Sequence, residues 1–74
     1  MTRTLDQLLP GESATVTGLD MESAARQRLV SLGFVPGQPV TALLRSCFGD
    51  PTAYRIMDTV IALRCSDARH IHIH

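Results

Sequence analysis

The chain contains 74 residues with a formal net charge of zero and only two cysteines, Cys47 and Cys65. A chain of this length builds one domain, which we assign to residues 1–74, and so few cysteines exclude the disulfide scaffold of many small secreted domains. The neutral charge argues against nucleic acid as a partner, because domains that bind phosphate backbones usually carry a basic excess.

The first predicted element is a short helical turn near the N-terminus. Thr4 and Gln7 have the spacing of a capping box, and Pro10-Gly11 end the turn. Three leucines are expected on one face of this turn: Leu5, Leu8 and Leu9. A strand follows over residues 12–19, in which Ala14 and Val16 alternate with polar residues and face the core.

Residues 22–32 are predicted to form the main helix. Its apolar stripe consists of Ala25, Leu29 and Leu32. Asp20 or Ser23 can cap the start of this helix. Gly33 stands where a residue with left-handed backbone ends a helix, and such a Schellman ending places Phe34 against Leu29.

The second half of the chain reads as strands separated by turns. A type II turn at residues 35–38 leads to a strand over residues 40–47. The side chains of this strand that are expected to face the core are Val40, Ala42 and Leu44. A hairpin of residues 52–57 and 59–64 then turns at Asp58, a residue type that tolerates left-handed backbone.

The C-terminal segment completes the predicted fold. Ser66 is expected to cap one helical turn, and the alternation over residues 70–74 predicts a strand with isoleucines inward and histidines outward. The pattern thus contains five strands, one helix and two short helical turns. Because closure removes exposed strand edges, we predict an all-β fold with one α-helix, a small five-stranded SH3-like barrel.

Targeting and catalytic motifs are missing from the sequence. The N-terminus carries no secretory leader pattern, and no apolar run approaches the ~20 residues that span a bilayer. We therefore expect a cytoplasmic protein with reduced thiols and no direct membrane insertion. The chain also lacks a phosphate-binding glycine loop and a nucleophile elbow, so we expect no enzyme, no catalytic residues and no required cofactor.

Three segments, in this order and spacing, carry a recognisable signature. Residues 28–37 read RLVSLGFVPG, residues 49–51 read GDP, and residues 62–64 read ALR before an Asp67-Ala68 turn and a closing strand. The first segment resembles the RLxxLGxxPG pattern of the FeoA family, the ferrous iron transport protein A group, and the second is similar to the GDP turn of that family. The resemblance extends over essentially the whole chain.

The resemblance has implications for function. It implies an SH3-like fold, a cytosolic location, no catalysis, and a supporting role for the ferrous-iron transporter FeoB through that transporter's cytosolic part, which carries a G domain. An alternative is a metal-responsive module similar to the SH3-like C-terminal domain of iron-dependent repressors. Those repressors begin with a DNA-binding helix-turn-helix domain, for which this chain has no room.

The histidines near the C-terminus are candidate metal ligands: His70, His72 and His74. Residues two apart on a strand share a face, so two neighbouring histidines of this set can converge on one Zn²⁺ or Fe²⁺ ion. A complete site needs further ligands from a cysteine, an acid or a second copy, which would give a metal-mediated homodimer. The alternative is a polar outer face that happens to consist of histidine.

The main helix is a candidate partner-binding surface. Arg26, Val30 and Phe34 can form an outward face beside the apolar stripe, and arginine and aromatic side chains are enriched at interfaces. The alternative is that Phe34 belongs to the core and that the arginines form a solvated face.

Overall fold

The structure is a computed structural model that describes residues 3–45 and 50–74. Within these ranges, six strands alternate with one longer helix and two short helices. In chain order the elements are β1 (Arg3–Thr4), η1 (Leu5–Gln7), β2 (Ser13–Leu19), α1 (Ser23–Ser31), β3 (Pro39–Arg45), β4 (Thr52–Ile56), β5 (Thr59–Leu63), α2 (Cys65–Ala68) and β6 (Ile71–Ile73). Among the described residues, none of the helices has both the length and the hydrophobicity of a membrane-spanning segment.

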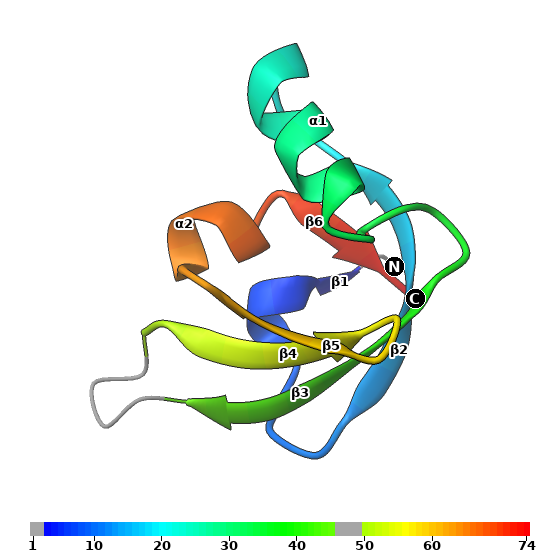
Figure 1. The fold of residues 1–74 in the computed structure, drawn as a ribbon. Coiled ribbons are helices and arrows are strands. Elements are labelled where there is room, and N and C mark those ends of the chain that lie inside the picture. Colours follow the sequence, from blue (N-terminus) through cyan, green and yellow to red (C-terminus); the bar gives the residue numbers. More distant parts are fainter. Residues whose placement is uncertain (1–2, 46–49) are drawn as a thin grey trace.

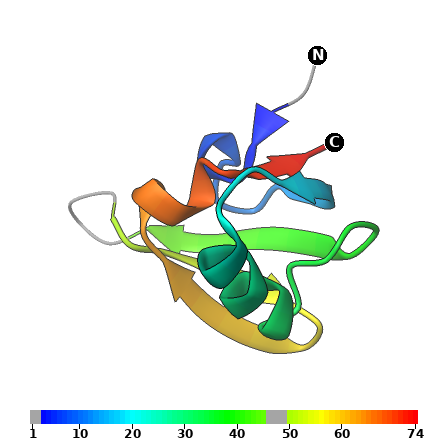
Figure 2. The same ribbon diagram turned by 90° about the horizontal axis from the view of Figure 1, so that it is seen from above.

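The strands form one antiparallel sheet in the order β1-β6-β2-β3-β4-β5. The last strand, β6, lies between β1 and β2, which brings the first and last strands of the described residues side by side (Figure 1). The sheet curls around the core, so that β6 and β2 lie on a different side of it from β3, β4 and β5 (Figure 2). Register shifts in the β2–β6 and β3–β4 pairings support this curl, because a bulge bends and twists a strand.

The prediction of a closed five-stranded barrel is wrong in two respects. The described residues contain a sixth strand, β1, whose two residues are too few to produce a detectable alternation. The sheet is also not closed by backbone pairing, since β1 and β5 stand at its two ends in the described part of the chain. The predicted class, mostly β with one main helix and short helical turns, is confirmed.

The core receives apolar side chains from η1, α1, α2 and strands β2 to β6. Its buried members are Leu5, Leu8, Val16, Leu29, Phe34, Val40, Ala42, Tyr54, Ile56, Leu63, Ala68, Ile71 and Ile73. The capping box predicted for Thr4 and Gln7 is present and precedes two fully buried leucines. Leu9 is 57% exposed, contrary to expectation, because the backbone is already extended at Leu8.

A bulge explains why one predicted core residue of β3 is exposed. Val40 and Ala42 are buried as expected, whereas Leu44 is 72% exposed. The pairing of β3 with β4 shifts between Ala42 and Leu44, and an extra residue moves the following side chain to the other face. The predicted continuation of this strand to Cys47 lies outside the described residues.

From β4 onward the structure differs from its prediction at two points: Met57, predicted as the last residue of a strand, belongs to the turn, and the predicted cap of α2 is absent. The β4–β5 hairpin turns at Met57 and Asp58, which both have positive φ, as a two-residue loop of the primed type requires. Strand β6 buries both isoleucines and turns its histidine outward, as predicted. Ser66 does not cap α2: the N-cap residue is Arg64, and the first backbone N–H of the helix is bound by a carboxylate from elsewhere in the chain.

Candidate functional site

Helix α1 is held to the core by a single side chain. Leu29 is its only buried residue, so the helix leaves most of its surface open to solvent. The N-cap residue is Glu22, which makes no side-chain capping bond, so the predicted caps Asp20 and Ser23 are both wrong. A helix with one buried side chain and no side-chain capping bond receives little stabilisation from tertiary packing. Its exposed face is a candidate contact surface.

The C-terminal end of α1 is the predicted Schellman ending. The backbone N–H of Phe34 donates to the carbonyl of Leu29 at 3.1 Å, and that of Gly33 donates to Val30 at 3.0 Å. Gly33 has a φ of +113°, in the left-handed region that glycine tolerates. This turn directs Phe34 inward and leaves Leu32 outside.

The structure contradicts the expected position of one residue of the predicted partner-binding face. Phe34 is fully buried, so its expected place on the outer surface is wrong and the alternative, a core residue, is confirmed. Arg26 and Val30 are exposed on α1, and their role in binding stays a prediction. Leu32, expected in the core stripe, is 41% exposed because the glycine turn follows it directly.

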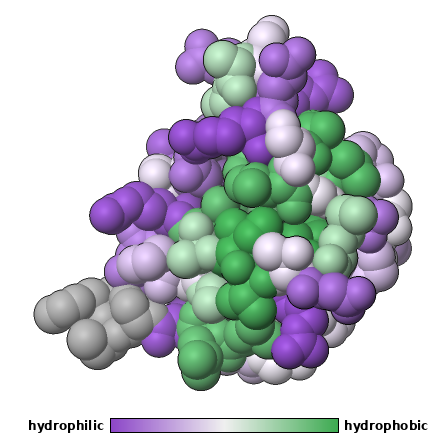
Figure 3. Space-filling model, viewed as in Figure 1, coloured by the Kyte–Doolittle hydropathy of each residue, from purple (hydrophilic) through white to green (hydrophobic). Residues whose placement is uncertain are grey.

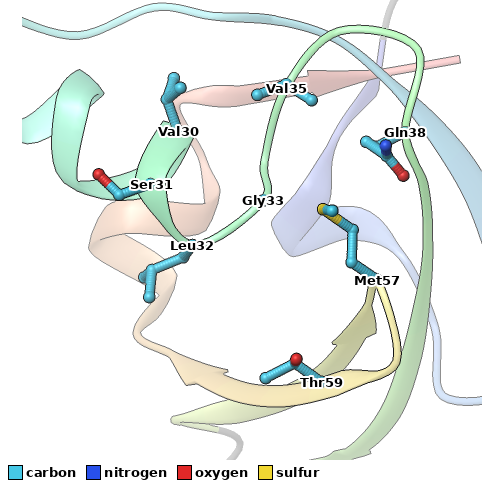
Figure 4. Close-up of a pocket in the computed structure, with 8 residues that line it drawn as sticks. All are labelled: Val30, Ser31, Leu32, Gly33, Val35, Gln38, Met57 and Thr59. Atoms are coloured by element: carbon cyan, nitrogen blue, oxygen red, sulfur yellow. The ribbon is translucent and has the colours of Figure 1, made fainter.

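A groove of about 420 Å³ lies between the end of α1 and the β4–β5 turn (Figure 4). Its lining residues are Val30, Ser31, Leu32, Gly33, Val35, Gln38, Met57 and Thr59, none of which is charged. Figure 3 shows apolar side chains in a band that extends from the lower end of α1 over the strands below it. Three of the lining residues, Val30, Leu32 and Met57, are exposed large apolar side chains.

A smaller hollow continues the groove along α1. It is lined by Ser23, Arg26, Gln27 and Val30, so that Val30 belongs to both. Arg28, on the same helix, lies 3.7 Å from the carboxylate of Asp67. The continuous surface thus combines an uncharged groove with the positive charge of Arg26.

The histidines lie in different surroundings. The Nε2 atom of His72 lies 3.9 Å from Oδ2 of Asp20, at the surface of β6. His70 lines a separate hollow between the start of α1 and α2, and the backbone N–H of His74 donates to Thr15. Among the described residues, no three histidine, cysteine, aspartate or glutamate side chains are grouped to hold a metal ion. A metal ion bound by His72 and Asp20 would need further ligands to complete its coordination.

Two further reactive side chains, Cys65 and Tyr54, make hydrogen bonds within the described residues. The Cys65 thiol is exposed and lies 3.8 Å from a carboxylate oxygen of Asp6, whereas Cys47 lies outside the described residues. The Tyr54 hydroxyl is buried and donates to the carbonyl of Leu5 at 3.4 Å. Burial raises the pKa of Tyr54 above its usual value of 10.0.

The sequence did not indicate the groove. Its walls come from α1 and from the β4–β5 turn, and only the folded chain brings Gly33 and Met57 together. One signal was present: a large apolar residue, Met57, stands in a two-residue hairpin turn, where asparagine and glycine are favoured.

Comparison with known proteins identifies relatives of the whole chain. The model of the FeoA domain matches residues 3–74. An Fe(2+) transport protein A/Fe(2+) transporter FeoB fusion protein of Porphyromonas gingivalis is 33% identical over 69 residues, which are 93% of this chain. The chain spans only 8% of the length of that fusion protein.

Solved structures show the same fold. Iron(II) transport protein A from Clostridium thermocellum has a TM-score of 0.91 and 31% identity, over 96% of this chain and 44% of that one. FeoA of Stenotrophomonas maltophilia, a prokaryotic SH3 domain protein solved with zinc, has a TM-score of 0.85 and 32% identity, over 96% and 88%. The predicted SH3-like fold is thus confirmed. A manganese-dependent transcriptional repressor shares the fold alone, with a TM-score of 0.85 and 20% identity over 97% and 40%.

Proposed function

The chain belongs to the FeoA domain family, and from this membership we propose that it is a non-catalytic, cytoplasmic accessory of ferrous-iron uptake that docks on the cytosolic part of a FeoB-type transporter. The observation that carries the proposal is the fusion protein of Porphyromonas gingivalis, in which a related domain is joined to the transporter. A covalent fusion keeps two partners at high effective concentration, which has value when they act in contact.

The shape of the chain supports docking rather than turnover. Helix α1 buries only Leu29 and offers a surface with the exposed side chains of Arg26 and Val30. Apolar and arginine side chains next to each other are typical of protein interfaces. This face is therefore the proposed contact with the transporter.

The experiment is ferrous-iron uptake by cells that contain the transporter but lack this chain. Uptake is expected to fall without the chain and to return with the wild-type gene. The R26E variant should fail to restore it, because the substitution reverses the charge of the proposed contact. R3E, which reverses an exposed charge on β1, is the matched control and should restore uptake. Full uptake without the chain contradicts the proposal.

A second candidate is a metal-responsive module. It is favoured by the approach of His72 to Asp20, since imidazole and carboxylate groups both bind divalent transition metals. The zinc complex of the Stenotrophomonas protein and the fold shared with a manganese-dependent repressor agree with this candidate. Zinc or ferrous iron would then alter the association of the chain with its partners and would not take part in catalysis.

A further inference from the structure

Met57 occupies a backbone conformation that its side chain does not favour. Its φ is +51°, and the left-handed region costs an ordinary residue roughly 1–2 kcal/mol. Asparagine or glycine would relieve this cost, and both are the usual residues of such a turn. Strain of this kind persists mainly where it supports function, so the methionine side chain itself is the feature to explain.

The side chain of Met57 forms one wall of the groove. A Cβ added to Gly33 would lie 2.9 Å from the Met57 sulfur, so the thioether rests directly against the glycine backbone. Even so, Met57 is 59% exposed. Figure 4 shows the Met57 side chain directed toward Gly33, on the opposite side of the groove from Leu32. A flexible, polarisable thioether in this place is suited to enclose an incoming apolar group.

The chemistry of the groove limits its occupant. None of its lining residues is charged, so a charged side chain would lose its hydration there without gaining a partner. Beyond Val30, the surface becomes positive at Arg26, which has no ion pair in the described part of the chain, while Arg28 faces Asp67. Helix α1 itself contains no acidic residue. The complementary partner therefore carries an apolar side chain with an acidic one beside it.

We propose, building on the function proposed above, that this groove receives an apolar side chain of the transporter's cytosolic part, with Met57 as its movable wall and Arg26 paired to an adjacent acidic residue. A second copy of the chain fits less well. A two-fold contact would set this surface against the same surface of the second copy, which offers no acidic residue to pair with Arg26, because none of the described residues that line the groove or the hollow beyond it is acidic.

The test compares two substitutions at apolar side chains of nearly equal exposure. Met57 is 59% exposed and lines the groove, whereas Leu9 is 57% exposed and does not. M57N should bind the isolated cytosolic part of the FeoB-type transporter at least tenfold more weakly than the wild-type chain, because central interface side chains carry most of the affinity. Its melting temperature should not fall, since asparagine suits the turn. L9N should bind like the wild type.

Nuclear magnetic resonance locates the contact independently of stability. On addition of the unlabelled cytosolic part, amide signals of residues 30–35 and 57–59 should shift or broaden. If M57N binds with the same affinity as the wild-type chain, or if the shifts are confined to other residues, the groove is not the contact. The proposed function would stand in either case. No binding by the wild-type chain overturns both. Concentration-dependent shifts at these residues without the transporter would assign the groove to a second copy and also overturn the inference.

Discussion

The carboxylate of Asp50 accepts a hydrogen bond from the backbone N–H of Cys65 at 2.7 Å, although the two residues are 15 positions apart. This bond supports the first turn of α2, which lacks a cap from its own sequence. The bond also gives a structural role to the aspartate of the GDP segment. Arg64 lies 3.9 Å from the same carboxylate, but this pair is exposed and contributes little.

Asp50→Ala is expected to lower the free energy of unfolding by about 1 kcal/mol, the usual effect of removing a helix-capping side chain. For a domain of this size, the loss corresponds to a melting temperature lower by roughly 4–8 °C. Asp50→Asn keeps an oxygen acceptor and should lose less than half as much. Equal losses for the two variants would show that charge, and not the hydrogen bond to Cys65, is what matters.

Gly33→Ala tests the approach of α1 to the β4–β5 turn. The new methyl group meets the sulfur of Met57 at 2.9 Å and stands on a residue with φ +113°. We expect a loss of about 1–3 kcal/mol in unfolding free energy, measured by denaturant titration. Gly18→Ala is the control, because a Cβ there meets nothing within 4 Å.

The double variant G33A/M57A separates the two causes. Removing the thioether relieves the steric part of the loss and leaves the backbone part, so the two substitutions should not be additive. Strict additivity would mean that Met57 does not contact Gly33 in solution.

Tyr54 provides a pH prediction with an optical signal of its own, because the chain has one tyrosine and no tryptophan. Burial raises its pKa above 10.0, so the folded state favours the protonated phenol. This contribution to stability is fully present below pH 10 and is lost as the pH rises through the higher pKa of the folded protein. Phenolate absorbance should therefore appear at higher pH in the native than in the denaturant-unfolded chain. Coincident titrations would contradict the burial of Tyr54.

Zinc is expected to bind at His72 and Asp20, whose facing atoms lie 3.9 Å apart. Two ligands leave a tetrahedral zinc ion incomplete, so a second copy should complete it, and zinc should convert monomers to dimers in sedimentation experiments. The imidazole signals of the last five residues should broaden at the same time. H72Q should abolish both effects. Responses confined to residues away from this strand would exclude the site.

Local patterns predicted the elements whose causes are local. The Gly33 turn, the burial of Phe34 as one of two alternatives, and the alternating last strand follow from neighbouring residues alone. Leu44 could not be placed because a bulge depends on the partner strand. The cap from Asp50 and the groove at Met57 depend on segments that only the tertiary fold brings together.

Calorimetric titration of the cytosolic part of a FeoB-type transporter with residues 1–74 shows whether α1 forms the contact. We expect saturable binding that R26E weakens and R3E leaves unchanged. Binding should also weaken as salt is raised, because an exposed arginine contact is screened. An absence of saturable binding by the wild-type chain, or equal affinity for R26E, would contradict the claim that α1 faces the transporter.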